Sequence, residues 1–171
     1  MAVSTRIAVI AVGDRLRHDD GIGWEALCRL RERAAARPLP PGTVLAECDQ
    51  DPGWVIRLWD DTELAIVLEP AHGRPGHPGR VYRLELDSAA LRRPDCLGPH
   101  GLGEAVEPAR ELDRLPRRLV SYAVEAADTT LGRGLSAPVA GAVDVLAERV
   151  EEEIVRHRGA AARDTGGDGR T

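Results

Sequence analysis

Three aspartates and three glycines lie within one short segment, residues 13–23, which reads Gly-Asp-Arg-Leu-Arg-His-Asp-Asp-Gly-Ile-Gly. The segment follows the apolar run 7–12 and precedes an amphipathic stretch, which predicts the order strand, loop, helix. A glycine-rich loop in this place usually binds phosphate, but the carboxylates of Asp14, Asp19 and Asp20 would repel an anion. Carboxylates at a loop tip favour a cation instead. The alternative interpretation is that Asp19 or Asp20 caps the following helix and interacts with its dipole.

Two further residues have metal-binding chemistry and lie next to predicted elements. Glu69 ends a second buried apolar run, and His100 lies in a glycine-rich segment before a helix. If the sheet is mostly parallel, the ends of its strands meet at one edge, so we expect Glu69 to lie near Asp20. Two carboxylates and one imidazole with open positions suit nickel, zinc, iron or manganese. Taken alone, His100 is more often a hydrogen-bonding loop residue than a ligand, and Glu69 could pair with an arginine.

The pattern of apolar residues predicts alternating strands and helices along the chain. Unbroken apolar runs are typical of buried parallel strands, whereas residues 80–86 alternate as an exposed or edge strand does. We expect strands at 6–12, 43–47, 63–68, 80–86 and 118–124, and helices at 21–36, 52–59, 104–113 and 136–157. This order predicts an α/β fold, a single three-layer domain over residues 1–158 with a mostly parallel twisted sheet and helices on both faces. Residues 159–171 are predicted to be a disordered tail.

Composition excludes several classes of function. A chain of 171 residues is long enough for one domain with a substantial core. Its net charge of −5 gives no general attraction to nucleic acid or to an anionic membrane, and no apolar run reaches the length of a membrane span. The first residues lack a signal-peptide profile, and three widely spaced cysteines, Cys28, Cys48 and Cys96, are typical of reduced thiols. We therefore expect a cytoplasmic monomer.

The motifs together resemble the hydrogenase maturation proteases over about residues 6–157. The first segment, Gly13-Asp14-x-Leu16-x-x-Asp19-Asp20-Gly21-x-Gly23, is similar to the N-terminal signature of that family. The family's hydrophobic strand with its terminal acidic residue matches Leu64–Ala71 here, and its histidine-containing glycine-rich segment matches His100-Gly101-Leu102-Gly103. Shorter similarities follow in order along the chain, namely Pro78-Gly79-Arg80-Val81, Leu115-Pro116 and Gly134-Leu135-Ser136-x-Pro138.

The resemblance implies an endopeptidase that removes the C-terminal extension of a nickel–iron hydrogenase large-subunit precursor after nickel has been inserted. The nickel is supplied by the precursor, which is the expected partner, and no organic cofactor is implied. Asp20, Glu69 and His100 match the family's metal-contacting positions and are the implied catalytic residues. The implied supporting loop residues are Gly13, Asp14, Asp19, Gly21, Gly23, Gly101 and Gly103.

The sequence departs from the family pattern at two of these positions. Asp14 stands where the family usually has Asn, and Glu69 stands where it usually has Asp. The segment around His100 is also short, so an alternative alignment places Gly98 at the histidine position. Two other functions stay open on the sequence: a non-catalytic homologue that binds or escorts the nickel-loaded subunit, and an α/β domain that binds a small ligand.

Overall fold

The computed structural model describes residues 6–72, 76–93 and 102–165. Its centre is a five-stranded sheet with the strand order β2-β1-β3-β5-β4. The first three strands in this order and β5 run parallel, and they span Ile7–Val12 (β1), Thr43–Cys48 (β2), Leu64–Ala71 (β3) and Arg118–Glu125 (β5). β4 (Val81–Asp87) pairs antiparallel with β5 at one edge. The predicted mostly parallel sheet is therefore confirmed, and residues 80–86 do contribute an edge strand.

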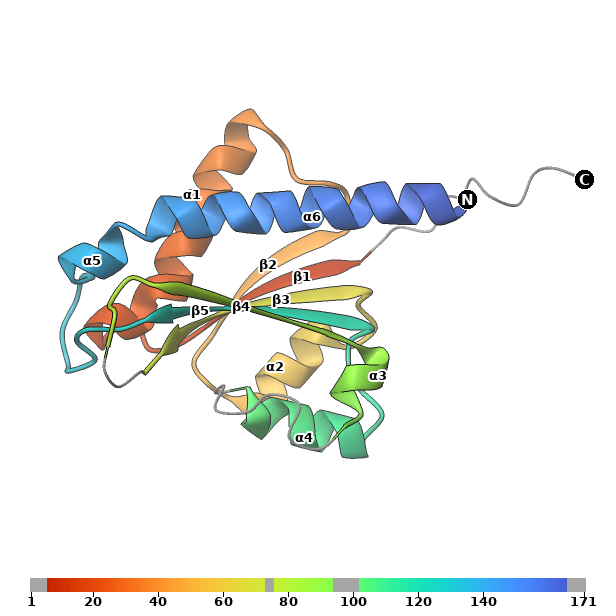
Figure 1. The fold of residues 1–171 in the computed structure, drawn as a ribbon, viewed down its shortest axis with the longest axis horizontal. Helices are drawn as coiled ribbons and strands as arrows, with labels where there is room; N and C mark the ends of the chain where they lie inside the picture. Colours follow the sequence, from red (N-terminus) through yellow and green to blue (C-terminus); the bar gives the residue numbers. More distant parts are fainter. Residues whose placement is uncertain (1–5, 73–75, 94–101, 166–171) are drawn as a thin grey trace, which may run out of the picture.

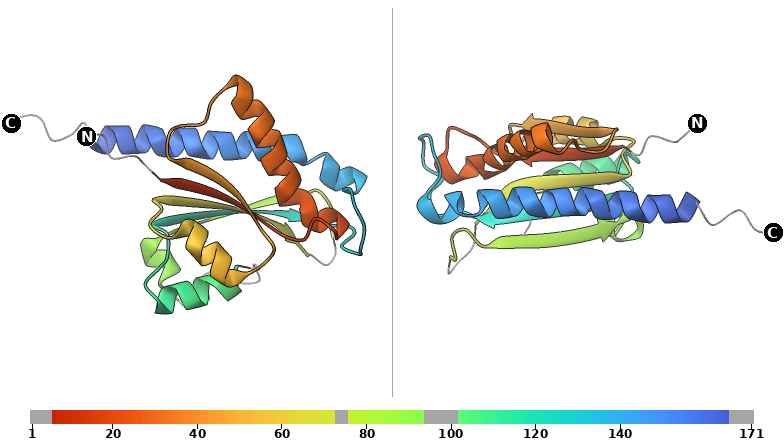
Figure 2. Two further views of the ribbon diagram at one scale, coloured as in Figure 1. Left: turned by 180° about the vertical axis from the view of Figure 1, so that it is seen from behind. Right: turned by 90° about the horizontal axis from the view of Figure 1, so that it is seen from above.

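Helices cover both faces of the sheet, as Figure 1 shows. One face carries α1 (Ile22–Ala36), the short α5 (Ala137–Ala140) and α6 (Val143–Thr165). The other carries α2 (Pro52–Trp59), α3 (Ser88–Leu91) and α4 (Gly103–Glu111). A 3-10 helix, η1 (His18–Gly21), leads directly into α1, and α1 crosses α6 (Figure 2). Within the described part of the chain, no helix is both long and apolar enough to cross a membrane.

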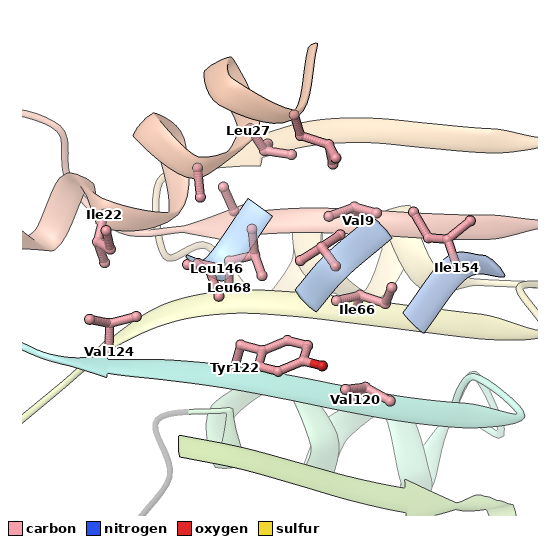
Figure 3. Close-up of a cluster of buried hydrophobic side chains, with 14 of the residues drawn as sticks. Val9, Ile22, Leu27, Ile66, Leu68, Val120, Tyr122, Val124, Leu146 and Ile154 are labelled. Carbon is pink, nitrogen blue, oxygen red and sulfur yellow. The ribbon is translucent and has the colours of Figure 1, made fainter. Parts of the chain in front are cut away.

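Two apolar cores lie on opposite sides of the sheet, because successive side chains of a strand point to opposite faces. Ile7, Val9 and Ala11 of β1 belong to the core beneath α1 and α6, whereas Ala8 and Ile10 belong to the core beneath α2 and α4. Figure 3 shows the first core, in which Leu146 and Ile154 of α6 pack over the sheet. Burial on both faces is the reason that β1 and β3 read as unbroken apolar runs.

The C-terminal helix differs from the prediction at both ends. The chain forms α5 and α6 rather than one helix from residue 136, with Gly141 at the C-cap of α5. Ser136 occupies the N-cap of α5 as predicted, but its hydroxyl makes no capping hydrogen bond. Residues 159–165 continue α6, so the prediction of a disordered tail is wrong for that part, where consecutive alanines favour a helix. The rest of the predicted tail, 166–171, lies outside the described residues.

A buried carboxylate attaches α6 to the sheet. Glu153 is fully buried, and its carboxylate accepts hydrogen bonds from Arg83 of β4 and from Arg118 and Tyr122 of β5. Burial alone would raise the pKa of Glu153, but the guanidinium of Arg83 and the hydroxyl of Tyr122 hold that pKa below its usual value. The carboxylate therefore stays ionised and joins the edge strand to the helical layer.

We expect Glu153→Gln to lower the free energy of unfolding by about 3 kcal/mol, because two arginines lose the carboxylate that neutralises them. Urea denaturation at pH 7 measures this change. The loss should be present above the ordinary glutamate pKa of 4.5 and should shrink as the pH falls through the lowered pKa of Glu153. The exposed neighbour gives a matched control, since Glu152→Gln should change stability by less than about 0.5 kcal/mol. Equal effects of the two changes would contradict this role of Glu153.

Candidate functional site

The carboxylates of Asp20 and Glu69 come from adjacent parallel strands. β1 and β3 pair in register from Ile7 with Leu64 to Ala11 with Leu68, so Glu69 follows the last paired residue of β3. Asp20 lies in η1, on the connection that leaves the carboxyl end of β1. Each residue is only 5% exposed. Buried acidic side chains without a cation partner are uncommon, so this edge of the sheet, on the left in Figure 1, is the candidate site.

Glu69 borders a cavity of about 240 Å³ at this edge. The hydroxyl of Ser121 in β5 donates to Glu69 Oε1 over 3.0 Å. Burial raises the pKa of Glu69 to about 7, and the hydrogen bond from Ser121 offsets only part of that effect. The other polar residues that line the cavity are Gln50, His72 and Glu104. Glu69 can therefore both take up and release a proton near neutral pH.

Gln50 links Asp20 to this cavity. Its Nε2 atom donates to Asp20 Oδ2 over 3.2 Å, and its side chain also lines the cavity beside Glu69. Gln50 follows β2 and adopts a left-handed backbone conformation with φ of +57°, which is uncommon for a residue other than glycine. Gln50 is not among the residues that the sequence motifs predict for the site. Its place in the polar loop after a parallel strand was the available signal, because that loop must lie at the same edge of the sheet.

Asp19 has a structural role that differs from capping. The N-cap of α1 is Gly21, with no side-chain hydrogen bond, so the interpretation that Asp19 or Asp20 caps the helix is wrong. Asp19 Oδ2 accepts from the backbone N–H groups of Ala127 and Asp128 and from the Ser136 hydroxyl, and Oδ1 accepts from the Ser136 N–H. Burial would raise the pKa of Asp19, but these donors together hold it below its usual value. The buried carboxylate therefore ties the first loop to the loop that follows β5.

Two glycines of the first motif permit close approaches of the backbone. Gly13 has φ of +150°, and a Cβ there would lie 2.1 Å from the carbonyl oxygen of Asp20. A Cβ at Gly23 would lie 2.8 Å from the carbonyl oxygen of Leu68, the residue before Glu69. Gly13 therefore lets the loop after β1 pass close to the backbone of η1, and Gly23 lets the first turn of α1 sit directly on β3.

Asp14, which stands where the family that the motifs resemble usually has Asn, keeps the local turn. Its Oδ1 accepts from the backbone N–H of Leu16 over 2.8 Å, a turn contact that either residue type can make. Its Oδ2 lies 3.5 Å from the guanidinium of Arg17. The additional negative charge is therefore placed beside a cation.

The predicted histidine-containing segment precedes α4. His100 and Gly101 lie outside the described residues, so their part in the site stays a prediction. The described chain resumes at Leu102, which lines the Glu69 cavity, and Gly103 begins α4. In the described ranges alone, no group of three or more His, Cys, Asp or Glu side chains is arranged to hold a metal ion. A cation at this edge would be held by Asp20 and Glu69 together with a further ligand.

Comparisons with known proteins place this site in a known fold. No family model and no curated protein matches the chain. The hydrogenase maturating endopeptidase HybD from Escherichia coli has a similar structure, with a TM-score of 0.70 and 21% sequence identity over 94% of each chain. The [NiFe] hydrogenase maturation protease HybD from Thermococcus kodakarensis gives 0.68 and 20%, over 87% of this chain and 99% of the other. HycI from Thermococcus kodakarensis KOD1, also a [NiFe] hydrogenase maturation protease, gives 0.61 and 20%, over 91% and 95%.

The chain has the fold of the hydrogenase maturation proteases. This is the fold that the sequence motifs predict, and it extends over nearly the whole chain. Within the maturation-protease fold, the first motif supplies Asp20, while Asp19 and the motif glycines hold the loop in place. Ser121 and Gln50 complete the surroundings of the two carboxylates.

We expect Asp19→Ala to lower the free energy of unfolding by about 3 kcal/mol, since it leaves several buried donors without an acceptor. Hydrogen exchange should also become faster at residues 127–136, where those donors lie. Thermal or urea denaturation together with exchange mass spectrometry measures both effects. Asp49→Ala, an exposed aspartate in the loop after β2, is the control and should alter neither quantity. Unchanged exchange at 127–136 in Asp19→Ala would rule out this role for the carboxylate.

The raised pKa of Glu69 predicts that Glu69→Gln stabilises the fold at high pH. An acidic group whose pKa is higher in the folded state destabilises the fold once the pH exceeds its pKa in the unfolded state. For Glu69 the pKa is about 7 in the folded state, against an ordinary value of 4.5 in the unfolded state. The variant should be more stable than wild type by about 3 kcal/mol above pH 7, and this gain should vanish as the pH falls to 4.5. Urea denaturation between pH 4.5 and 8 tests this, with Glu104→Gln, at an exposed residue of the same cavity, as the matched control. A pH-independent effect of Glu69→Gln would contradict the prediction.

Proposed function

We propose that this chain is an endopeptidase that removes the C-terminal extension of a nickel–iron hydrogenase large-subunit precursor after nickel insertion. One observation carries the proposal. Two buried carboxylates, Asp20 and Glu69, leave adjacent parallel strands at one edge of a fold whose solved relatives are named hydrogenase maturation endopeptidases. The motif that contains Asp20 and the histidine segment that contains His100 support the same function.

The nickel already bound to the precursor is part of the substrate, and it supplies positive charge that polarises nearby carbonyl and water oxygens. Asp20 and Glu69 contact that metal, with His100 as the third contact. Gln50 orients the carboxylate of Asp20 through its amide hydrogen bond, and Ser121 orients Glu69. Orientation of this kind matters because a shift of about 1 Å at a reacting centre can lower a rate about 100-fold.

The same groups explain how an unmetallated precursor is rejected. Burial makes ionisation of Glu69 unfavourable near neutral pH, and only a nearby cation offsets that unfavourable energy. A precursor that lacks nickel offers no such cation, so it gains nothing from the carboxylates. The nickel-loaded precursor is then selected because it binds more tightly than the nickel-free precursor, without a separate checking step.

Trimming of the precursor from the same organism tests the proposal. We expect mass spectrometry to show loss of the C-terminal extension with nickel-loaded precursor and none with nickel-free precursor. Asp20→Ala, Glu69→Ala and His100→Ala should each lower kcat/KM by about 100-fold or more, as misplacement at a reacting centre does. Glu148→Ala, at an exposed position of α6, is the control and should cleave as wild type does.

Other outcomes distinguish the alternatives. Binding of the nickel-loaded precursor without any trimming by wild type would replace the endopeptidase with the escort function. Full activity in His100→Ala would favour the alignment that places Gly98 at the histidine position.

A further inference from the structure

A second hollow, with a volume of about 640 Å³, adjoins the Glu69 cavity. Its lining includes Arg15 and Leu16 of the first loop, Trp24 of α1, and Arg133 of the loop after β5. Gln50 lines both spaces and donates to Asp20, so it lies at the boundary between them. The proposed reaction uses only the first cavity, which leaves the larger hollow without a role.

Two leucines project from the loops beside this hollow. Leu16 is 50% exposed and Leu131 is 73% exposed, so both leave much apolar surface in solvent. The Gly132 N–H donates to the Leu16 carbonyl over 2.8 Å, and the His18 N–H donates to the Gly132 carbonyl over 2.9 Å. A Cβ at Gly132 would lie 2.1 Å from the His18 ring, so the contact between these loops requires glycine. Their apolar surface is therefore presented on a fixed backbone, as in a site for protein binding.

The two arginines of the hollow are available to bind a carboxylate. The guanidinium of Arg15 lies over the Trp24 ring, 5.1 Å from its centroid, and in the part of the chain that is described neither Arg15 nor Arg133 forms an ion pair. Arg15 does help to lower the pKa of Glu47, but that carboxylate is bound first by Arg31. Two carboxylates, those of Asp14 and Asp49, also line the hollow. The charge of Asp14 is placed against Arg17, and among the described residues Asp49 forms no ion pair with Arg15 or Arg133.

We propose that this surface, formed by Arg15, Leu16, Leu131 and Arg133, is the docking site for the precursor polypeptide. An apolar side chain of the precursor packs on Leu16 and Leu131, and a neighbouring acidic side chain binds Arg15 and Arg133. The inference rests on the proposed function, because the occupant is the same precursor. A segment bound here continues past Gln50 into the cavity that contains Glu69, so docking directs the metal-bearing region toward the two carboxylates.

Docking away from the reacting bond contributes equally to substrate and transition state, so it should alter KM and leave kcat unchanged. We expect Leu16→Ser/Leu131→Ser to raise KM for nickel-loaded precursor about tenfold, as truncation of interface anchors does. Arg15→Gln/Arg133→Gln should raise KM by a similar factor at low salt and by less at high salt. The effect of the arginine change should also disappear with a precursor whose acidic residues near the cleavage site are replaced by amides.

Two matched controls come from the same chain. Leu112, 61% exposed after α4, and Arg117, exposed just before β5, lie away from the carboxyl edge of the parallel strands. Leu112→Ser and Arg117→Gln should leave KM unchanged. Thermal unfolding of all four variants identifies any loss of folding.

Binding of nickel-free precursor, measured by surface plasmon resonance, separates the two proposals. Wild type should bind it weakly without cleavage, and both docking variants should lose that binding. If wild type trims nickel-loaded precursor while the docking variants keep the wild-type KM, the docking surface is refuted and the endopeptidase function stands. If wild type binds both precursors through these residues and trims neither, docking is supported and the endopeptidase function fails. Failure of wild type to bind either the nickel-free or the nickel-loaded precursor would overturn both.

Discussion

The site depends on one buried carboxylate that takes no direct part in the proposed chemistry. Asp19 receives four hydrogen bonds from residues more than a hundred positions away in the sequence, and these bonds fix the loop that carries Asp20. A buried carboxylate is unfavourable unless its acceptor sites are filled, so the loop after β5 must adopt the one path that supplies the donors. Both the candidate site and the surface beside it therefore depend on the same set of hydrogen bonds.

The buried carboxylates of Asp19 and Glu69 have opposite surroundings. Asp19 is surrounded by N–H donors and is stabilised as the anion, whereas Glu69 has a single hydroxyl donor and is held closer to neutrality. The fold thus satisfies the buried carboxylate of Asp19 with its own donors and gives that of Glu69 a single hydroxyl donor. This difference suits the proposed function, because a carboxylate fully satisfied by the protein would gain little from a metal carried by the substrate.

The sequence was sufficient to predict the fold and to place Asp20 and Glu69 at the same edge of the sheet. Unbroken apolar runs at 7–12 and 64–68 indicate buried parallel strands, and parallel strands bring their following loops to one edge. The partners of those carboxylates were not predictable. Ser121 is one polar residue inside a buried strand, and Gln50 depends on a left-handed backbone conformation that its residue type does not favour. Capping by Asp19 or Asp20 was the alternative interpretation because a local interaction is visible in sequence, whereas the donors from 127–136 become neighbours of Asp19 only after folding.

The contact between Gly23 and β3 sets a lower limit on the width of the site. The first turn of α1 rests against the carbonyl of Leu68 with no room for even one carbon atom, and the residues on either side of that contact lead to Asp20 and Glu69. Helix and strand are already as close as their backbones allow. Any side chain at position 23 would therefore push the first turn of α1 away from β3, so substitution there can widen the separation of the segments that carry Asp20 and Glu69 and cannot narrow it.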